Sequence, residues 1–356
     1  MSGFETIVGQ NQALRALLRI LKSGRIPHSL LFSGIDGVGK RSAAVRLAMA
    51  RSCVCYAAQQ RQPDRSSSDN PEAFSDYPCG QCNSCLRIAA GIHPDITTIQ
   101  PEAGVIKIGE IRNLCRILSM KSFEGHGRVA IISDAHLMNP PASNALLKML
   151  EEPPEQTLLI LTARQSADLL PTIVSRCLHI RFNPVSRPAL SDALIQHHGF
   201  GTDEASTVAA LAGGSFSRAL SMKKAAWMNW RNWLITELSR LGSSPIHVIL
   251  ALSEKLSKNR DALSDVFEIM LSWFRDILIF TCGSTHVINR DYLAHLEEAS
   301  RRCSRSDLIQ IVNAVKSAQA HIEARTNIRL SLDHLLLRLW QQLNMENPRS
   351  ADHCEG

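Results

Sequence analysis

The sequence predicts an α/β domain with a mostly parallel sheet, followed by a second half that is entirely helical. Three observations support this prediction. Short apolar runs alternate with amphipathic helical stretches as far as Pro184. A glycine-rich turn follows the first of these runs, and from Ser186 onwards the apolar spacing is helical throughout.

The elements follow one another as a parallel sheet requires. A helix over 7–22 precedes the strand 30–33, a glycine turn and the helix 41–50, which together form a strand-loop-helix unit. The stretch 59–78 is rich in Ser, Asp, Pro and Gln, which indicates a mobile surface insertion. Further strands are expected at 96–99, 129–132 and 157–161, and further helices at 108–120 and 141–150.

Composition sets outer limits on function. The 356 residues are enough for two or three domains, and the 45% hydrophobic content is ordinary for a globular protein. No long uncharged apolar run and no signal peptide are apparent, so we expect a cytoplasmic protein without a membrane partner. The net charge of +6 permits contact with nucleic acid, although the basic residues look scattered along the chain.

The glycine turn has the form of a phosphate-binding P-loop. The sequence Gly34-Ile-Asp-Gly37-Val-Gly39-Lys40 fits G-x-x-x-x-G-K, in which backbone N–H groups and the lysine surround phosphates. Arg41 occupies the position of the Ser or Thr whose hydroxyl contacts Mg²⁺. We therefore expect binding without turnover, no binding, or a loop kept only for packing, and ATP binding is doubtful.

A second departure from an ATPase lies at the end of the strand 129–132. A hydrolysing site needs one carboxylate for the metal and one to polarise the attacking water. Here Ser133 and Asp134 follow the strand, so a single carboxylate is present. Two independent motifs thus lack a metal contact, which favours a degenerate nucleotide site.

A cysteine cluster gives the most specific chemical signal. Cys79, Cys82 and Cys85 have Cys-x-x-Cys-x-x-Cys spacing, and Cys53 or Cys55 could supply a fourth thiolate. This set is typical of a structural Zn²⁺ site, and an iron–sulfur cluster or free thiols are the alternatives. A closed site of four thiolates has no open position for a substrate.

Together with three further segments, these motifs resemble bacterial clamp-loader subunits of the AAA+ class, over roughly residues 5–222. The segments are GRIPHSLLFSG (24–34), SNALLKMLEEPPE (143–155) and VSRC (174–177). The resemblance implies an AAA+ P-loop domain with an inserted zinc module, a small helical lid and an all-α collar domain. The implied ranges are 1–184 with the zinc module at about 53–85, 185–225 and 226–345, before a frayed tail at 346–356.

The resemblance also assigns roles to single residues. Arg176 matches an arginine finger that reaches the ATP of a neighbouring subunit in trans. Val8 and Gly9 match a segment that lines the adenine pocket, and Cys53 matches the first zinc ligand better than Cys55 does. Ser217 matches a nucleotide-sensing arginine of the motor subunit, although Arg218 lies only one residue further on.

Two functional hypotheses follow. The first is a non-motor subunit of the DNA polymerase III holoenzyme without ATPase activity of its own. It would act in a hetero-oligomer with gamma/tau and delta-like subunits, which loads the sliding clamp onto primed DNA. The second is a self-sufficient, motor-type AAA+ ATPase that uses Lys40, Ser42 and Asp134. A zinc-dependent DNA-binding module is a third possibility that lacks a concentrated basic stripe in its favour.

Overall fold

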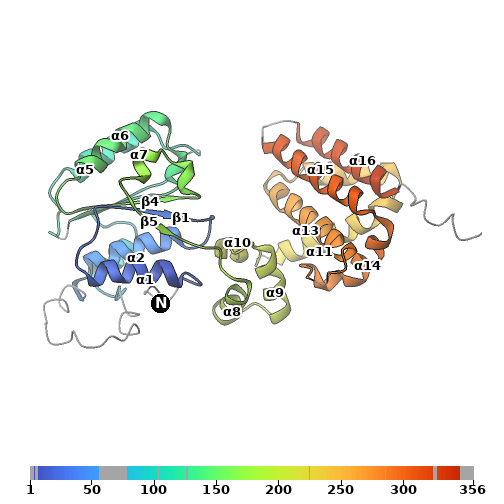
Figure 1. Cartoon of the computed structure of the whole chain (residues 1–356), viewed down its shortest axis with the longest axis horizontal. Coiled ribbons are helices and arrows are strands. Elements are labelled where there is room, and N and C mark those ends of the chain that lie inside the picture. The colour runs from blue at the N-terminus through green and yellow to red at the C-terminus, as the bar shows by residue number, and fades with distance from the viewer. Residues whose placement is uncertain are drawn as a thin grey trace, which may run out of the picture. The chain divides into compact units, whose positions relative to one another are not determined.

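The fold consists of two compact units, Met1–Ala205 with Ala212–Ala219, and Ser206–Leu211 with Leu220–Gly356. Figure 1 shows strands and helices in the first unit and helices in the second. The expected insertion at 59–78, up to residue 77, and the expected tail at 346–356 lie outside the described residues. The computed structural model describes residues 4, 7–55, 78–102, 104–125, 127–223, 225–284, 286–323 and 327–344.

A five-stranded sheet of parallel strands, in the order β2-β3-β4-β1-β5, forms the centre of the first unit. The four strands expected from the sequence are present. The fifth, β5, escaped prediction because only Ile180 among its four residues is buried, so that no apolar run marks it. The strands are β1 (Ser29–Ser33), β2 (Ile96–Ile99), β3 (Arg128–Ile132), β4 (Thr157–Ala163) and β5 (Leu178–Arg181).

Helices cover both faces of this sheet, as the buried strands require. Successive side chains of β1 alternate between two cores, with Leu30 and Phe32 in one and Leu31 in the other. In Figure 1, α1 and α2 lie below the sheet and α5, α6 and α7 lie above it. The helices of this layer structure are α1 (Asn11–Lys22), α2 (Lys40–Ser52), α4 (Asn83–Ala89), α5 (Ile108–Leu118), α6 (Pro140–Glu151) and α7 (Pro171–Val174). The expected α/β domain, a parallel sheet with helices on both faces and a glycine-rich turn between β1 and α2, is confirmed.

The first helix is shorter than expected. It begins at Asn11 rather than at residue 7, because Gln10 has a non-helical backbone. The Gln10 side chain instead exchanges two hydrogen bonds with the backbone of Asn183, at 2.6 and 3.0 Å. These bonds fasten the start of α1 to the segment that follows β5.

Three short helices follow the sheet. Their residues are divided between the two units, since Ala212–Ala219 belongs with the sheet whereas Ser206–Leu211 belongs with the second unit. They are α8 (Arg187–His198), α9 (Thr202–Leu211) and α10 (Phe216–Ser221). The expected boundaries of a separate lid at 185 and 225 remain a proposal.

The regular elements among the described residues of the second unit are all helices. The buried side chains of Trp273 and Phe274 on α13 lie at its centre. Arg231, which has no exposed surface, donates hydrogen bonds of 2.6 to 2.9 Å to Asn289 and Asp291. The helices are α11 (Ala225–Arg240), α12 (Ile246–Ser257), α13 (Leu263–Thr281), α14 (Leu293–Arg302), α15 (Arg305–Glu323) and α16 (Ile328–Asn344).

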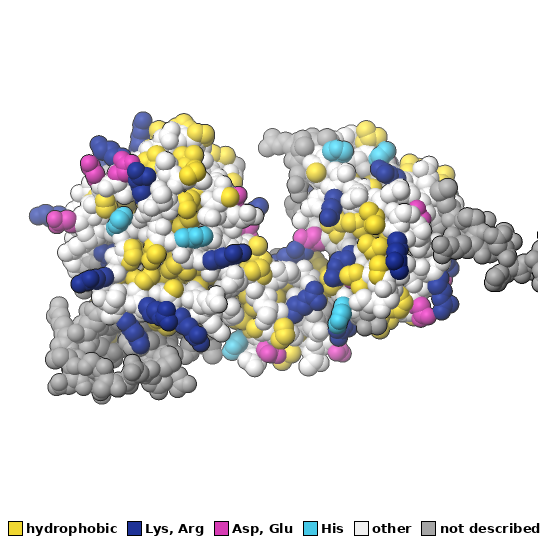
Figure 2. All heavy atoms as spheres, viewed as in Figure 1, with side chains coloured by type: hydrophobic (Ala, Val, Ile, Leu, Met, Phe, Trp, Pro, Cys, Tyr) yellow, Lys and Arg dark blue, Asp and Glu magenta, His cyan; other side chains and the backbone are white. Residues whose placement is uncertain are grey.

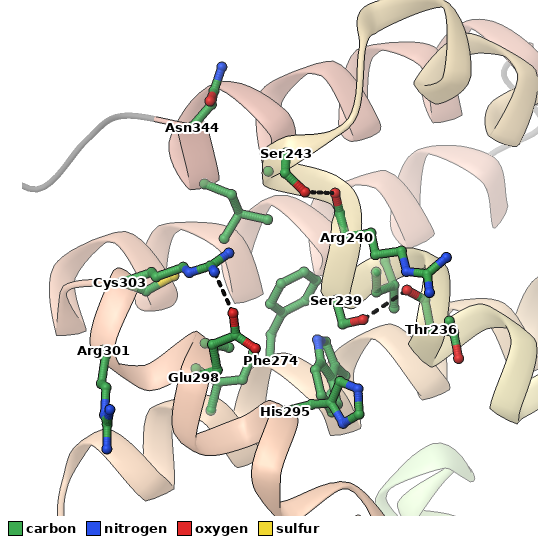
Figure 3. A pocket seen from close by; sticks show the side chains of 17 residues that line it. Thr236, Ser239, Arg240, Ser243, Phe274, His295, Glu298, Arg301, Cys303 and Asn344 are labelled. Atoms are coloured by element: carbon green, nitrogen blue, oxygen red, sulfur yellow. Dashed lines mark hydrogen bonds and ion pairs between the residues drawn. The ribbon is translucent and has the colours of Figure 1, made fainter.

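A cavity of about 640 Å³ lies in the second unit, between α11, α13, α14 and the end of α16 (Figure 3). Phe274 lines the cavity. Several polar side chains that also line it form hydrogen bonds or ion pairs with neighbouring residues. The Ser239 hydroxyl donates to the backbone carbonyl of Thr236 at 2.8 Å, and Arg302 pairs with Glu298. None of the helices in the described part of the chain is long and apolar enough to cross a membrane.

Candidate functional site

The P-loop joins β1 to α2, and its backbone takes conformations that glycine allows. Gly37 and Gly39 have φ angles of 79° and 100°, and Gly39 is the N-cap of α2. A Cβ atom at Gly34 would lie 2.4 Å from the carbonyl oxygen of Phe182. The expected motif therefore folds as a tight strand-to-helix turn at a helix N-terminus.

Lys40 is turned toward its own loop. Its ammonium group donates hydrogen bonds to the carbonyl oxygens of Gly34 and Ile35, the latter at 2.9 Å, and lies 3.5 Å from the Asp36 carboxylate. The side chain is only 6% exposed, and this burial lowers the pKa of Lys40, although the nearby carboxylates of Asp36 and Asp134 oppose the shift. The ammonium group of Lys40 therefore contacts oxygen atoms of its own loop. In a phosphate-binding P-loop, the corresponding lysine contacts oxygen atoms of the bound phosphate.

The two positions at which an ATPase holds its metal ion are occupied by unsuitable groups. The exposed Arg41 side chain donates a hydrogen bond of 2.7 Å to Gln100, which follows β2. Ser133 is 4% exposed, and its hydroxyl has no hydrogen-bond partner among the described residues. Asp134 follows in a left-handed conformation with a φ of 52°, and its backbone N–H donates to the Thr162 hydroxyl at 2.9 Å. A cation and a neutral hydroxyl thus occupy positions that would coordinate Mg²⁺.

The start of α10 rests on the P-loop. The backbone N–H groups of Phe216 and Ser217 donate to the carbonyl oxygen of Gly37 at 3.0 and 3.2 Å. A Cβ atom at Gly37 would lie 2.2 Å from the Ser215 hydroxyl and 2.9 Å from the Ser217 Cβ atom. Ser217, the expected counterpart of a sensing arginine, therefore packs directly on the loop and brings no positive charge to it.

The segment expected to line an adenine pocket is packed against the chain after β5. Gly9 has a φ of 71°, and a Cβ atom there would lie 2.9 Å from a methyl carbon of Val185. Val8 is partly buried beside it. The structure thus brings Val8 and Gly9 into the same unit as the P-loop, while their contact with adenine stays a prediction.

Arg176 lies just after α7 and belongs to a different part of the surface. Its guanidinium group donates to the Thr172 carbonyl at 3.0 Å and to the Glu151 carboxylate at 2.8 Å. Its backbone carbonyl accepts a hydrogen bond of 2.5 Å from Ser29 on β1. The side chain remains 36% exposed, so its anchored backbone presents a guanidinium group at the surface. Sequence reasoning missed Glu151 as its partner, although the Leu-Glu-Glu-Pro-Pro motif contains this residue.

Four cysteines converge beside the end of α2. The Sγ atoms of Cys53, Cys79, Cys82 and Cys85 all lie within 4.8 Å of one another. The separations Cys53–Cys79, Cys53–Cys82 and Cys79–Cys85 are 3.5, 4.0 and 4.0 Å. Four thiolates at about 2.3 Å from a tetrahedral Zn²⁺ ion would lie about 3.8 Å apart. The donor set and its spacing therefore fit a zinc ion.

The environment of the cluster favours a thiolate at Cys79. Burial alone would raise the pKa of this thiol, but hydrogen bonds from the backbone N–H groups of Gln81 and Cys82 and from the Cys53 and Cys82 thiols lower it to about 6. Cys53 directly follows α2 and is fully buried within the cluster. Cys55 is exposed and lies outside the group of four, and a hydrogen bond with Cys79 raises its pKa to about 11. The geometry therefore supports Cys53 over Cys55 as the fourth ligand.

Polar contacts outside the cysteine cluster also hold helix α4 in place. Glu124 accepts hydrogen bonds from Ser84 at 3.1 Å and Arg87 at 2.6 Å, both on α4, and contacts His93 at 3.0 Å. Asp95, which is 2% exposed, accepts the backbone N–H group of Glu124 at 2.8 Å. The module is thus fastened between the thiol cluster and a second set of polar contacts.

Comparison with known proteins identifies the family. The family model described as DNA polymerase III, delta subunit, matches residues 9–186, which is half of the chain. The chain belongs to this DNA polymerase III delta-subunit family. A second model, described as DNA polymerase III, delta subunit, C terminal, matches residues 225–341. The expected resemblance to clamp-loader subunits is thereby confirmed.

Individual relatives agree with this assignment. DNA polymerase III subunit delta' of Bacillus subtilis is 26% identical over 334 residues, which cover 93% of this chain and 96% of the relative. DNA polymerase III subunit tau/gamma of Haemophilus influenzae is 32% identical over 191 residues, covering 54% of this chain and 25% of that subunit. Among solved structures, a DNA polymerase III gamma subunit-related protein from Thermotoga maritima has a TM-score of 0.46 and 20% identity, with 93% of this chain and all of that chain covered. The family model and the two sequence relatives identify the chain as a delta-prime-like member of the clamp-loader family, related to tau and gamma.

Proposed function

We propose that this chain is a non-motor subunit of a bacterial clamp loader, which supplies Arg176 to ATP bound by a neighbouring subunit. In the complete assembly it would help to load the sliding clamp onto primed DNA in the cytoplasm. Its partners would be gamma/tau and delta-like subunits in a hetero-oligomer, as part of the DNA polymerase III holoenzyme. The chain itself would hold a structural Zn²⁺ ion on Cys53, Cys79, Cys82 and Cys85.

The contrast between two places on the same domain carries this proposal. At the P-loop, Arg41 and Ser133 occupy both metal-binding positions, and Lys40 is bonded to its own loop. At the end of α7, by contrast, Arg176 is partly exposed on a backbone that Ser29 anchors. An arginine supplied in trans needs only to stabilise charge on the transferring phosphoryl group. A subunit can therefore assist hydrolysis without carrying it out.

Substitutions in a reconstituted complex with a tau/gamma-type subunit test this proposal. We expect Arg176→Ala to lower ATP turnover by about 10³-fold or more at the site next to it, as loss of an arginine finger does. Lys40→Ala should leave turnover within about twofold, because this chain contributes no hydrolysis of its own. ATP turnover by the purified chain alone that disappears with Lys40→Ala would instead establish the self-sufficient ATPase.

A matched control distinguishes the specific loss of Arg176 from a general effect of removing a positive charge from the surface of the domain. Arg164 is an exposed arginine of the same domain, paired with Asp36 at 2.7 Å. Arg164→Ala removes the same charge without removing Arg176. Equal losses of turnover for Arg164→Ala and Arg176→Ala would contradict a specific role for Arg176.

A further inference from the structure

The positive charge of this chain is concentrated in one segment. Residues 6–63 contain nine Lys and Arg residues but a single acidic residue, Asp36, so the segment carries a net charge of +8. The other 298 residues contain 30 basic and 32 acidic side chains, which gives them a net charge of −2. The segment covers α1 and α2, and it therefore accounts for the basic character of the whole chain.

Helix α1 displays part of this charge as a row. Arg15, Arg19 and Lys22 are exposed and follow one another at four and three residues, which places them on one side of a helix. The opposite side of α1 is buried in the core through Ala13, Leu17 and Leu21. At a rise of 1.5 Å per residue the row is about 10 Å long. Arg25, also exposed, follows just beyond the helix.

Arg15, Arg19 and Arg25 differ from other arginines of this chain that form ion pairs with Asp or Glu. Within the described part of the chain, no acidic side chain forms an ion pair with Arg15, Arg19 or Arg25, and α1 itself contains no Asp or Glu. On α14, in contrast, Arg301 and Arg302 pair with Glu297 and Glu298 one turn away. Lys and Arg side chains gather at the lower edge of the unit in Figure 2, on the side where Figure 1 shows α1 and α2.

We propose that this face of α1, with Arg15, Arg19, Lys22 and the following Arg25, binds the sugar–phosphate backbone of a nucleic acid strand. One strand of a DNA duplex presents one phosphate charge per about 3.4 Å of helix axis, so a row of about 10 Å would face about three phosphates of such a strand. Arg15, Arg19 and Arg25, which form no ion pair with an acidic side chain among the described residues, can displace the counterions of the strand when they bind, and this release drives the association. The interpretation of the basic residues as scattered missed this row, because Arg15, Arg19 and Lys22 are not adjacent in sequence but are spaced at four and three residues along one side of a helix.

An anionic lipid surface is the main competing ligand, and the packing of α1 argues against it. A helix that binds a membrane surface inserts its apolar face between the lipids. The apolar face of α1 is already part of the domain core. Only the charged face is free, and this face suits a polyanion that lies along the surface. This inference goes beyond the proposed function, since it involves neither Arg176 nor the P-loop.

The test measures binding of the full chain to a fluorescein-labelled oligo(dT) strand by fluorescence anisotropy, over about 0.05 to 0.2 M sodium chloride. We expect Arg15→Gln/Arg19→Gln to reduce the slope of log K against log salt by about 1.4, which corresponds to two lost phosphate contacts on single-stranded DNA. The affinity at about 0.1 M salt should fall by about tenfold or more. Both positions are exposed, and thermal unfolding followed by circular dichroism checks that the variant is folded.

The control variant removes two arginines of the paired set, Arg301→Gln/Arg302→Gln, with the same change in net charge. Binding that depends on α1 leaves this control close to the wild-type chain. Equal losses in both double variants would assign binding to the overall charge and overturn the proposal, as would unchanged affinity for Arg15→Gln/Arg19→Gln. Absence of DNA binding, or binding only to phosphatidylserine vesicles, would also overturn it. ATP turnover of the complex without DNA is independent of these variants, so this test and the Arg176 test can fail separately.

Discussion

The guanidinium group of Arg176 and the carboxylate of Glu151 form an ion pair of 2.8 Å between the end of α6 and the residues after α7. Both side chains are substantially exposed, at 36% and 51%. An exposed pair contributes about 0 to 1 kcal/mol, so it can orient Arg176 and still open at little cost. In the proposed function, Arg176 exchanges Glu151 for a phosphate of the neighbouring subunit.

The first prediction follows from this exchange. Glu151→Gln removes the competing carboxylate but keeps the shape of the side chain, so Arg176 should engage the neighbouring nucleotide more readily. We expect ATP turnover of the reconstituted complex to rise by up to about fivefold, the equivalent of about 1 kcal/mol. The double variant Glu151→Gln/Arg176→Ala should turn over ATP as slowly as Arg176→Ala alone. A rise that persists in the double variant would show that Glu151 acts independently of Arg176.

The second prediction concerns the cysteine cluster. We expect the purified chain to contain one zinc ion, measured by mass spectrometry of the metal content. Cys79→Ser should lose this zinc and lower the melting temperature of the first unit, because Cys53 at the end of α2 would no longer be tied to α4. Cys55→Ser is the matched control and should retain both the metal and the stability. Loss of zinc from Cys55→Ser but not from Cys53→Ser would show that Cys55, and not Cys53, is the fourth zinc ligand.

A third prediction addresses the nucleotide site. Because Arg41 and Ser133 replace the metal-binding groups, Mg²⁺ should not tighten any binding of ATP to the isolated chain. Calorimetry with and without Mg²⁺ should give dissociation constants within about twofold of each other. The variant Arg41→Thr/Ser133→Asp should introduce a dependence on Mg²⁺, since it restores a hydroxyl and a carboxylate. Mg²⁺-dependent binding by the unmodified chain would contradict the degenerate site.

The fourth prediction tests the buried arginine of the second unit. Arg231→Ala leaves the buried side-chain oxygen of Asn289 without the donor that Arg231 supplies, and leaves Asp291, which is 43% exposed, without its cation. We expect this variant to lose about 2 to 4 kcal/mol of unfolding free energy in urea. Arg301→Ala breaks a surface pair and should change the unfolding free energy by less than about 1 kcal/mol. Similar values for both variants would show that the Arg231 contacts contribute little.

Local patterns in the sequence were sufficient for the elements that depend on neighbouring residues. The apolar runs predicted four of the five strands, and the spacing of Gly34, Gly39 and Lys40 predicted the turn between β1 and α2. Cys-x-x-Cys-x-x-Cys spacing likewise predicted the convergence of three thiols. In each case the relevant residues lie within a few positions of one another, so backbone geometry largely determines their arrangement.

Contacts between distant residues were decided only by the tertiary structure. The edge strand β5 forms through pairing with β1 rather than through an apolar run of its own. Folding also places Ser217 on Gly37 and Glu151 beside Arg176. These relationships depend on how separate elements pack, and no spacing along the chain encodes them. The sequence alone thus determined the P-loop turn and the presence of Arg41 and Ser133 at the two expected metal positions, whereas the packing of the sheet and helices decided which groups surround this turn and that Arg176 lies at the surface.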